Sequence, residues 1–224
     1  MSEAGRTRVI KVQWHNPDVF ELWLERDNFD FVPGDCVALF GSDGQGSRPY
    51  SLASGIHDPE LRFLIRQMED GEVSPYLAQL QPGDTVKMSP PFGWFRPGQN
   101  GDRAPFVFMA TGTGIAPFMA YLRSYPDRPP QQCYYGVRQR ADAVAVPWLR
   151  EQIDLRLAVS REVADDAHHG RIADLWADSL PLPSDTDYYL CGLDAMIDEA
   201  TVWLQGQGVD IARIHRECFF NAEL

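Results

Sequence analysis

The stretch FVFMATGTGIAP, residues 106–117, joins an apolar run to a glycine-rich turn. Residues 106–110 are apolar without a break, which is typical of a parallel strand that is buried on both faces. The glycines of the turn at residues 111–117 let the backbone approach a ligand closely. A helix that begins at Pro117 would direct its positive end at that ligand, so the stretch predicts a phosphate-binding turn. A plain strand–helix turn is the alternative, because the stretch is neither G-x-G-x-x-G nor a P-loop.

Helical and strand-like segments alternate from this turn to the end of the chain. The expected strands cover residues 106–110, 132–137, 155–160, 188–191 and 214–220, and the expected helices cover residues 117–123, 145–152, 172–177 and 195–205. This alternation predicts a doubly wound parallel sheet. Ligands of such a sheet bind beyond the carboxyl ends of its strands, which is where the glycine-rich turn lies.

The first hundred residues have a different texture, with short β-branched and aromatic runs separated by turns. The expected strands cover residues 7–14, 19–24, 36–40, 50–54, 61–67 and 85–88. This spacing predicts an antiparallel barrel or sandwich. One short helix is expected, with Ser74 as its N-cap and Pro75 as its first residue, followed by residues 76–80.

The polar stretch RPGQNGDRA, residues 96–104, is the expected linker between these two textures. It places the expected domains at residues 1–100 and 101–224, each of a size that is common for a single domain.

Composition and charge exclude several classes of protein. The 224 residues include 20 Lys and Arg against 32 Asp and Glu, and the formal net charge of −12 argues against broad binding to nucleic acid or anionic membranes. No run of 18 apolar residues and no apolar leader is present, so we expect neither membrane insertion nor a signal peptide. The cysteines lie far apart, at positions 36, 133, 191 and 218, and predict reduced thiols in a cytoplasmic protein without a metal site.

Two segments of the first half carry side chains suited to a cofactor. In RPYS, residues 48–51, the arginine can clamp a phosphate, the tyrosine can stack on a flat ring and the serine can hydrogen-bond a ring nitrogen. The segment GEVS, residues 71–74, precedes the expected helix and is a second candidate anion site. A surface arginine, a core tyrosine and a simple helix cap are the alternative interpretations.

Two further candidates lie near the carboxyl ends of expected strands. Cys191 and Gly192 end one strand, where a ligand-facing residue would lie, although a buried inert cysteine is the alternative. Glu217 and Phe219 lie in the last expected strand. A carboxylate in so aromatic a segment either faces solvent or has a functional place, and its position alone leaves both interpretations open.

Taken together and in order, these motifs resemble the ferredoxin–NADP reductase family of flavoenzymes. The matching motifs are RPYS at 48–51, GEVS at 71–74, GTGIAP at 112–117, YGVR at 135–138, CG at 191–192 and ECF at 217–219. The resemblance spans about residues 6–220. It implies an N-terminal antiparallel flavin-binding β-barrel followed by a doubly wound parallel-sheet nicotinamide-nucleotide-binding domain.

The resemblance also implies catalytic and cofactor-binding residues. Ser51 would lie near the flavin N5, Cys191 near the nicotinamide carbon that exchanges hydride, and Glu217 near Ser51 and the flavin. The implied flavin contacts are Arg48 at the phosphate, Tyr50 on the isoalloxazine ring, Pro49, Ser51, Gly71, Val73, Ser74 and Phe219. The implied nucleotide contacts are Gly112, Thr113, Gly114, Pro117, Arg138, Arg161, Arg171, Cys191 and Gly192.

The activity that the resemblance implies is hydride transfer between a nicotinamide and FAD, with single electrons passing to or from a separate ferredoxin or flavodoxin. FMN is the less favoured flavin, and Trp94 either stacks on an adenine or lies in the core or at its rim. The elements Ser160-Arg161 and Gly170-Arg171 resemble those that hold a 2′-phosphate, which favours NADPH over NADH, although NAD-using relatives carry the first element too.

Two other functions stay open. The chain could be the reductase component of a multi-subunit oxygenase, or a flavin-binding relay or redox-sensing subunit without turnover, which the intact Ser51, Cys191 and Glu217 set disfavours. An acidic redox partner would be repelled by a chain of charge −12 unless arginines form a local dock, and the candidates for that dock are Arg62, Arg66 and Arg96. The pair at 168–169, both histidines, is interpreted as a solvated turn.

Overall fold

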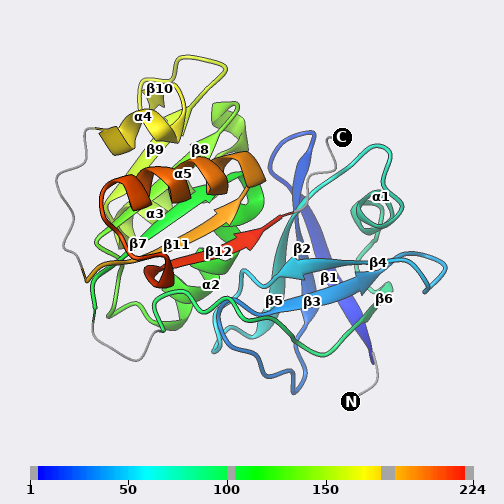
Figure 1. The fold of residues 1–224 in the computed structure, drawn as a ribbon. Coiled ribbons are helices and arrows are strands. Elements are labelled where there is room, and N and C mark those ends of the chain that lie inside the picture. The colour runs from blue at the N-terminus through cyan, green and yellow to red at the C-terminus, as the bar shows by residue number, and fades with distance from the viewer. Residues whose placement is uncertain (1–4, 100–103, 178–184, 220–224) are drawn as a thin grey trace. The chain divides into compact units, whose positions relative to one another are not determined.

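The computed structural model describes residues 5–99, 104–177 and 185–219, drawn as a coloured ribbon in Figure 1. The chain forms two compact units. The first unit contains residues 1–96 and 116–124, and the second contains residues 97–115 and 125–224. Each unit is built on its own six-stranded sheet.

The sheet of the first unit is antiparallel and its strands follow the order β4-β3-β6-β1-β2-β5. Its elements are β1 (Gly5–Trp14), β2 (Val19–Glu25), β3 (Cys36–Phe40), β4 (Ser47–Ser51), β5 (Glu60–Arg66), α1 (Val73–Ala78) and β6 (Thr85–Met88). Leu52, one residue past β4, forms a bridge with Phe63 of β5, which joins the two ends of the sheet. The sheet thereby closes into the predicted barrel and leaves the first part of β4 on an open edge.

The barrel core explains why these runs form strands. Phe20, Leu22 and Leu24 alternate along β2, and all three side chains are fully buried. Phe63 and Ile65 of β5 belong to the same apolar cluster. This period of two is the one that a strand with one face on a core requires.

Two expectations for the first unit are wrong in detail. The expected strand at 50–54 lies earlier, at β4, because its pairing with β3 runs from Ser47 to Ser51. The expected helix begins earlier as well, at Val73, and its N-cap is Glu72 rather than Ser74. The Ser74 hydroxyl instead accepts a hydrogen bond from the Met68 N–H at 2.9 Å, so it closes the preceding loop.

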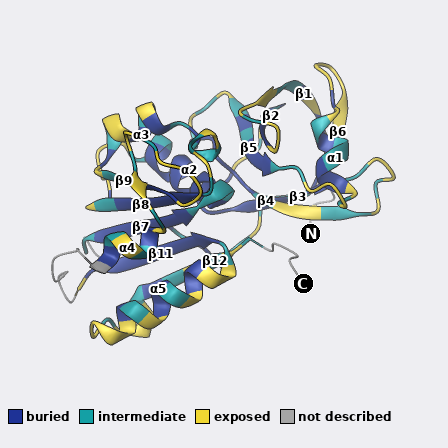
Figure 2. Ribbon diagram, turned by 90° about the horizontal axis from the view of Figure 1, so that it is seen from above, coloured by how far each residue is buried: buried dark blue, intermediate teal, exposed yellow. Residues whose placement is uncertain are grey.

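The sheet of the second unit is parallel, as predicted, with the order β10-β9-β8-β7-β11-β12. Its strands are β7 (Phe106–Thr111), β8 (Gln132–Val137), β9 (Leu155–Val159), β10 (His168–His169), β11 (Asp187–Gly192) and β12 (Ile214–Cys218). The helices α3 (Val146–Gln152), α4 (Ile172–Ala177) and α5 (Asp194–Gly206) alternate with them. Strands β7 and β11 are dark blue in Figure 2, in agreement with the continuous apolar run that predicted a buried strand.

The strand order of this sheet reverses between β7 and β11. From β7 the chain adds β8, β9 and β10 on one side, and then returns to add β11 and β12 on the other side. Such a reversal opens a crevice beyond the carboxyl ends of the two central strands, because their connections leave in opposite directions. The turn that follows β7 and the Cys191-Gly192 pair that ends β11 both lie at this place.

Helix α2 (Ala116–Ser124) belongs to the first unit, although its sequence directly follows the turn of the second unit. The Ile56 N–H donates a hydrogen bond to the Ser124 hydroxyl at 3.0 Å. A Cβ at Gly55 would lie 2.8 Å from the Arg123 Cβ, so the absence of a side chain at Gly55 allows this close packing. The expected division into domains at residues 100 and 101 stays a prediction, and residues 100–103 of the expected linker lie outside the described residues.

Other expectations concern a membrane span and metals. None of the helices in the described part of the chain is long and apolar enough to span a bilayer. No group of three or more His, Cys, Asp and Glu side chains suited to a metal ion occurs within residues 5–99, 104–177 and 185–219. His168 and His169 form the short strand β10 instead of the expected turn, because they pair with Ala158 and Val159.

Candidate functional site

The carboxyl ends of β7 and β11 fit together through two glycines. A Cβ at Gly114 would overlap the Cys191 carbonyl group, whose carbon would be 2.7 Å away, and would lie 2.8 Å from the Gly192 Cα. Gly192 has a φ of +138° and faces the Thr111 backbone just as closely. No side chain is tolerated at either position, because these contacts are far below ordinary van der Waals distances. The GTG and CG motifs are therefore two halves of one backbone contact.

Hydrogen bonds hold this contact in place. The Thr111 hydroxyl accepts a bond from the Leu193 N–H at 2.9 Å, which ties the end of β7 to the residue after β11. The Phe219 N–H donates to the Gly192 carbonyl at 3.0 Å, which ties the residue after β12 to the same place. Because the contact is held from both sides, the three strand ends have one defined arrangement.

Cys191 and Glu217, two of the candidate catalytic residues, lie side by side. They are direct neighbours in the parallel ladder of β11 and β12. The thiol of Cys191 donates to a Glu217 carboxylate oxygen at an Sγ–Oε2 distance of 3.8 Å. Cys191 is fully buried and Glu217 is half-buried, so the pair combines a desolvated sulfur with a carboxylate that reaches the surface.

In the turn between β7 and α2, Gly112 and Thr113 are half-buried and Gly114 is buried. Residues 112–115 form one turn of 3₁₀-helix, and α2 begins at Ala116, one residue before the expected start. Gly112 has a φ of +53° and open space where a Cβ would lie. Pro117 is the second residue of α2 and is buried, a place where its missing N–H leaves no helical bond unmade.

The ends of β8 and β9 carry the arginines that were expected at a nucleotide. The Arg161 N–H donates to the Arg138 carbonyl at 2.9 Å, so these two residues follow their strands side by side. The Arg161 side chain is exposed. Arg171, in contrast, forms an ion pair with Glu199 of α5 at 2.6 Å. Of the two arginines expected at a 2′-phosphate, one is therefore already neutralised by a carboxylate.

A further ionic network lies on the loop after β9 and was not signalled by any sequence motif. Asp166 forms ion pairs with Arg140 and Arg150, both at 2.9 Å. The hydrogen bond from Arg140 is the main reason why the pKa of Asp166 falls to about 2, with Arg150 contributing as well. Glu162 accepts a hydrogen bond from the Arg140 N–H. The partners are at least 16 residues apart in the sequence, which is why no local pattern revealed them.

In the first unit, the RPYS segment forms the open edge strand β4. The Arg48 side chain is exposed and donates to the neighbouring Ser47 carbonyl at 2.9 Å. Burial raises the pKa of the Tyr50 phenol to about 12, against the opposing effect of the Arg48 charge. Ser51 is buried, and its hydroxyl lies 3.4 Å from the thiol of Cys36, its direct partner on β3. Pro49, between Arg48 and Tyr50 in the strand, is exposed.

The GEVS segment forms a tight loop at the start of α1. A Cβ at Gly71 would lie 3.1 Å from the Met68 carbonyl oxygen, so the loop is closed on itself. Glu72 makes no side-chain cap, and Val73 and Ser74 are buried in the first turn. The first N–H groups of a helix have no partner inside it. The exposed Arg48 guanidinium and the first N–H groups of α1 suit a flavin phosphate. The Tyr50 phenol suits the flavin ring.

Comparisons with known proteins agree with this arrangement of motifs. Residues 10–96 match the family described as "Oxidoreductase FAD-binding domain", and residues 108–201 match the one described as "Oxidoreductase NAD-binding domain".

Two curated relatives and one solved structure illustrate the likeness. The anthranilate 1,2-dioxygenase electron transfer component of Acinetobacter baylyi is 31% identical over 86% of this chain, which spans 59% of that protein. The flavodoxin/ferredoxin–NADP reductase of Shigella flexneri is 29% identical, with 88% of each chain covered. The crystal structure of a ferredoxin NADP⁺ reductase from Neisseria gonorrhoeae superposes with a TM-score of 0.88 at 21% identity over 98% of this chain and 100% of that one, and shows the same fold.

The backbone contact at the strand ends can be tested by adding one methyl group. Gly114→Ala is expected to lower the free energy of unfolding by about 2 kcal/mol or more. The new Cβ would overlap the Cys191 carbonyl group and push the turn after β7 away from the end of β11. Gly206→Ala is the matched control, since nothing lies within 4 Å of its Cβ, and it should change stability by less than about 1 kcal/mol. Urea unfolding followed by circular dichroism measures both. Equal effects of the two substitutions would contradict the assigned contact.

Proposed function

Because this chain belongs to the ferredoxin–NADP reductase family, we propose that it is a FAD-dependent NAD(P)H oxidoreductase that serves a separate one-electron carrier. The observation that carries the proposal is the glycine-to-glycine contact at the ends of β7 and β11, which presents a nucleotide turn next to the Cys191–Glu217 pair. A binding module has no need of a thiol and a carboxylate at such a place. Turnover is therefore favoured over a passive relay or redox-sensing subunit.

The proposed domains are a FAD-binding barrel at residues 1–100 and an NAD(P)-binding α/β domain at residues 101–224. Bound FAD supplies the hydride acceptor for the nicotinamide and the ability to release electrons singly. The barrel holds the flavin phosphate with the Arg48 guanidinium and the first N–H groups of α1. Tyr50 supplies a ring face, and burial raises the pKa of its phenol to about 12.

The remaining side chains orient the reacting groups. The Ser51 hydroxyl, whose neighbour is the Cys36 thiol, would hydrogen-bond the reactive ring nitrogen of the flavin. The buried Cys191 sulfur would lie against the nicotinamide carbon, and Glu217 accepts a hydrogen bond from the thiol, which keeps the sulfur in one orientation. Phe219 covers the flavin ring. Gly112, Thr113 and the start of α2 hold the pyrophosphate of the nucleotide.

The proposed partner is a separate ferredoxin or flavodoxin. The name of the Shigella relative supports this reading, and that of the Acinetobacter relative supports a second one, in which the chain is the reductase component of an oxygenase. A cytoplasmic location is part of the proposal, since all four cysteines are free thiols.

The direct test of this function is the colour of the purified protein. We expect a yellow protein that retains FAD and loses its colour under anaerobic conditions when NADPH is added, because the flavin becomes reduced. Absorbance spectroscopy measures the change, and ferricyanide should then be reduced catalytically. A colourless protein that does not take up FAD would contradict the proposal, and a yellow protein that no nicotinamide nucleotide bleaches would favour the relay subunit.

Ser51 should affect the rate of flavin reduction more than the binding of nucleotide. Ser51→Ala is expected to slow flavin reduction by at least about tenfold, since it removes one hydrogen bond to the reacting ring nitrogen. The Kd of NADPH should change far less. Stopped-flow measurements separate the two, and Ser51→Thr, which keeps the hydroxyl, should retain most of the rate. Equal losses of rate and affinity in Ser51→Ala would count against the assigned role.

The choice of nucleotide should depend on Arg161. NADPH is the expected substrate, and Arg161→Ala should lower its kcat/KM about tenfold by removing one charge-assisted hydrogen bond to the 2′-phosphate, while kcat/KM for NADH stays unchanged. Arg156→Ala is the matched control, because Arg156 is an exposed arginine of β9, the strand that precedes Arg161, and pairs with Asp154. Steady-state assays with both nucleotides measure this. A wild-type preference for NADH, or equal losses with both nucleotides, would overturn the assignment.

A further inference from the structure

Three apolar side chains of the barrel unit are exposed on two adjoining loops. Trp94 is 98% exposed, Phe92 is 47% exposed and Val32 is 39% exposed. The two loops touch, since a Cβ at Gly93 would lie 3.3 Å from the Gly34 carbonyl oxygen. These three residues are called the Trp94 patch. An indole so fully in water is unusual for a side chain that normally buries a large apolar area.

The backbone that carries the Trp94 patch is rigidly held. Phe92 and Cys36 exchange two backbone hydrogen bonds, of 2.7 and 2.9 Å. The Arg96 guanidinium donates to the Phe95 carbonyl at 2.8 Å and to the Gly93 carbonyl at 3.0 Å, and pairs with Asp35 at 2.9 Å. Phe95 itself is buried and packs on Phe118 of α2. Trp94 is therefore presented by a pre-organised loop, which lowers the entropy cost of binding a partner.

Phe92 of the Trp94 patch is connected to Ser51 through Cys36, which pairs with both residues. Ser51 is the direct partner of Cys36 across β4 and β3, and Cys36 is bridged to Phe92 on its other side. Direct partners in a ladder lie on the same face of the sheet. Two strand spacings of about 4.8 Å place Phe92 roughly 10 Å from Ser51. The patch thus lies at the end of β4 that would hold the flavin ring, whereas Arg48, the proposed phosphate ligand, lies three residues away toward the other end.

The ion pairs of the barrel unit argue against a basic docking surface, which is the alternative. The three arginines that were candidates for a basic dock are each neutralised: Arg62 by Glu60 at 3.7 Å, Arg66 by Asp18 at 3.4 Å and Arg96 by Asp35 at 2.9 Å.

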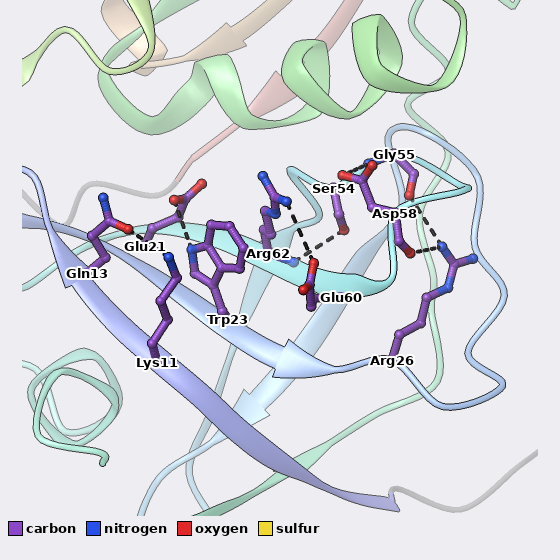
Figure 3. Close-up of polar contacts among 10 residues, drawn as sticks. All are labelled: Lys11, Gln13, Glu21, Trp23, Arg26, Ser54, Gly55, Asp58, Glu60 and Arg62. Atoms are coloured by element: carbon purple, nitrogen blue, oxygen red, sulfur yellow. Dashed lines mark hydrogen bonds and ion pairs between the residues drawn. The ribbon is translucent and has the colours of Figure 1, made fainter. Parts of the chain in front are cut away.

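Arg62 is further occupied by a neighbouring ring. Figure 3 shows it beside Trp23. Its guanidinium carbon lies 3.8 Å from the centroid of that ring, and the Lys11 Nζ lies over the same ring at 3.7 Å. These three arginines therefore do not form the basic dock that an acidic carrier would need on a chain of charge −12.

We propose that the Trp94 patch is the docking surface for the protein electron acceptor, which meets it with an apolar face next to its own redox group. This inference rests on the proposed function, since it names where the one-electron carrier binds. Tryptophan is the residue type most enriched among side chains that dominate binding energy, and Arg96 and Asp35 form a neutral polar rim beside it. The adenine of FAD is the competing occupant, but with the phosphates at Arg48 it would lie toward the opposite end of β4.

The test compares a protein acceptor with a small one. Trp94→Ala is expected to raise the KM for a [2Fe–2S] ferredoxin at least about tenfold, while NADPH-dependent reduction of ferricyanide, which needs no docking surface, stays unchanged. Trp94→Phe should recover part of the affinity. Trp14→Ala is the matched control, because Trp14 is an indole of the same unit that is 44% exposed and far along the sheet order from β4, and it should not change the ferredoxin KM.

Salt provides a second measurement. Apolar docking predicts that the wild-type KM for ferredoxin changes less than about threefold between low salt and 0.3 M NaCl, because screening acts on charges and not on apolar contacts. An unchanged ferredoxin KM in Trp94→Ala, a steep rise of the wild-type KM with salt, or no reduction of ferredoxin by the wild type would each overturn the proposal. A loss of bound FAD in Trp94→Ala would assign the indole to the adenine. Failure of the wild type to reduce ferricyanide would instead reject the proposed function.

Discussion

The backbone contact between Gly114 and the Cys191-Gly192 pair is the constraint on which the candidate site depends. It forms because β7 and β11 are adjacent in the sheet, where Cys191 pairs with Ala110. These two residues are far apart in the sequence, so only the fold brings them together. Without side chains at Gly114 and Gly192, the turn after β7 can lie directly on the end of β11. The same contact fixes Cys191, and through the ladder it fixes Glu217 on β12.

Much of the fold could be predicted because its signals are local. The runs at β3, β8 and α4 have the bounds expected from sequence, since each is flanked by turn residues and buries one period of apolar side chains. The reductase motifs were found for the same reason, because each occupies a few consecutive residues.

The features that were missed depend on long-range contacts. Helix α2 groups with the barrel unit through Gly55 and Ile56, more than 60 residues away, and no pattern within the helix signals this. Ser74 is not the N-cap of α1, because its hydroxyl accepts a hydrogen bond from the Met68 N–H instead. The pairing of Arg171 with Glu199 likewise changes which arginine is available to a phosphate. Sequence motifs identify candidate catalytic and binding residues. The partners that neutralise their charges or orient their side chains are known only from the tertiary structure.

In the proposed reaction, a hydride passes from a nicotinamide into a bound flavin, with Ser51 and Cys191 at the two ends of that transfer. Single-turnover stopped-flow reduction with NADPH deuterated at C4 tests it most directly. We expect flavin bleaching to be several-fold slower with deuterium on one face of the nicotinamide ring and unchanged with deuterium on the other face, because one stereospecific C–H bond breaks in the step observed. Equal rates with both labelled nucleotides and with unlabelled NADPH would contradict it.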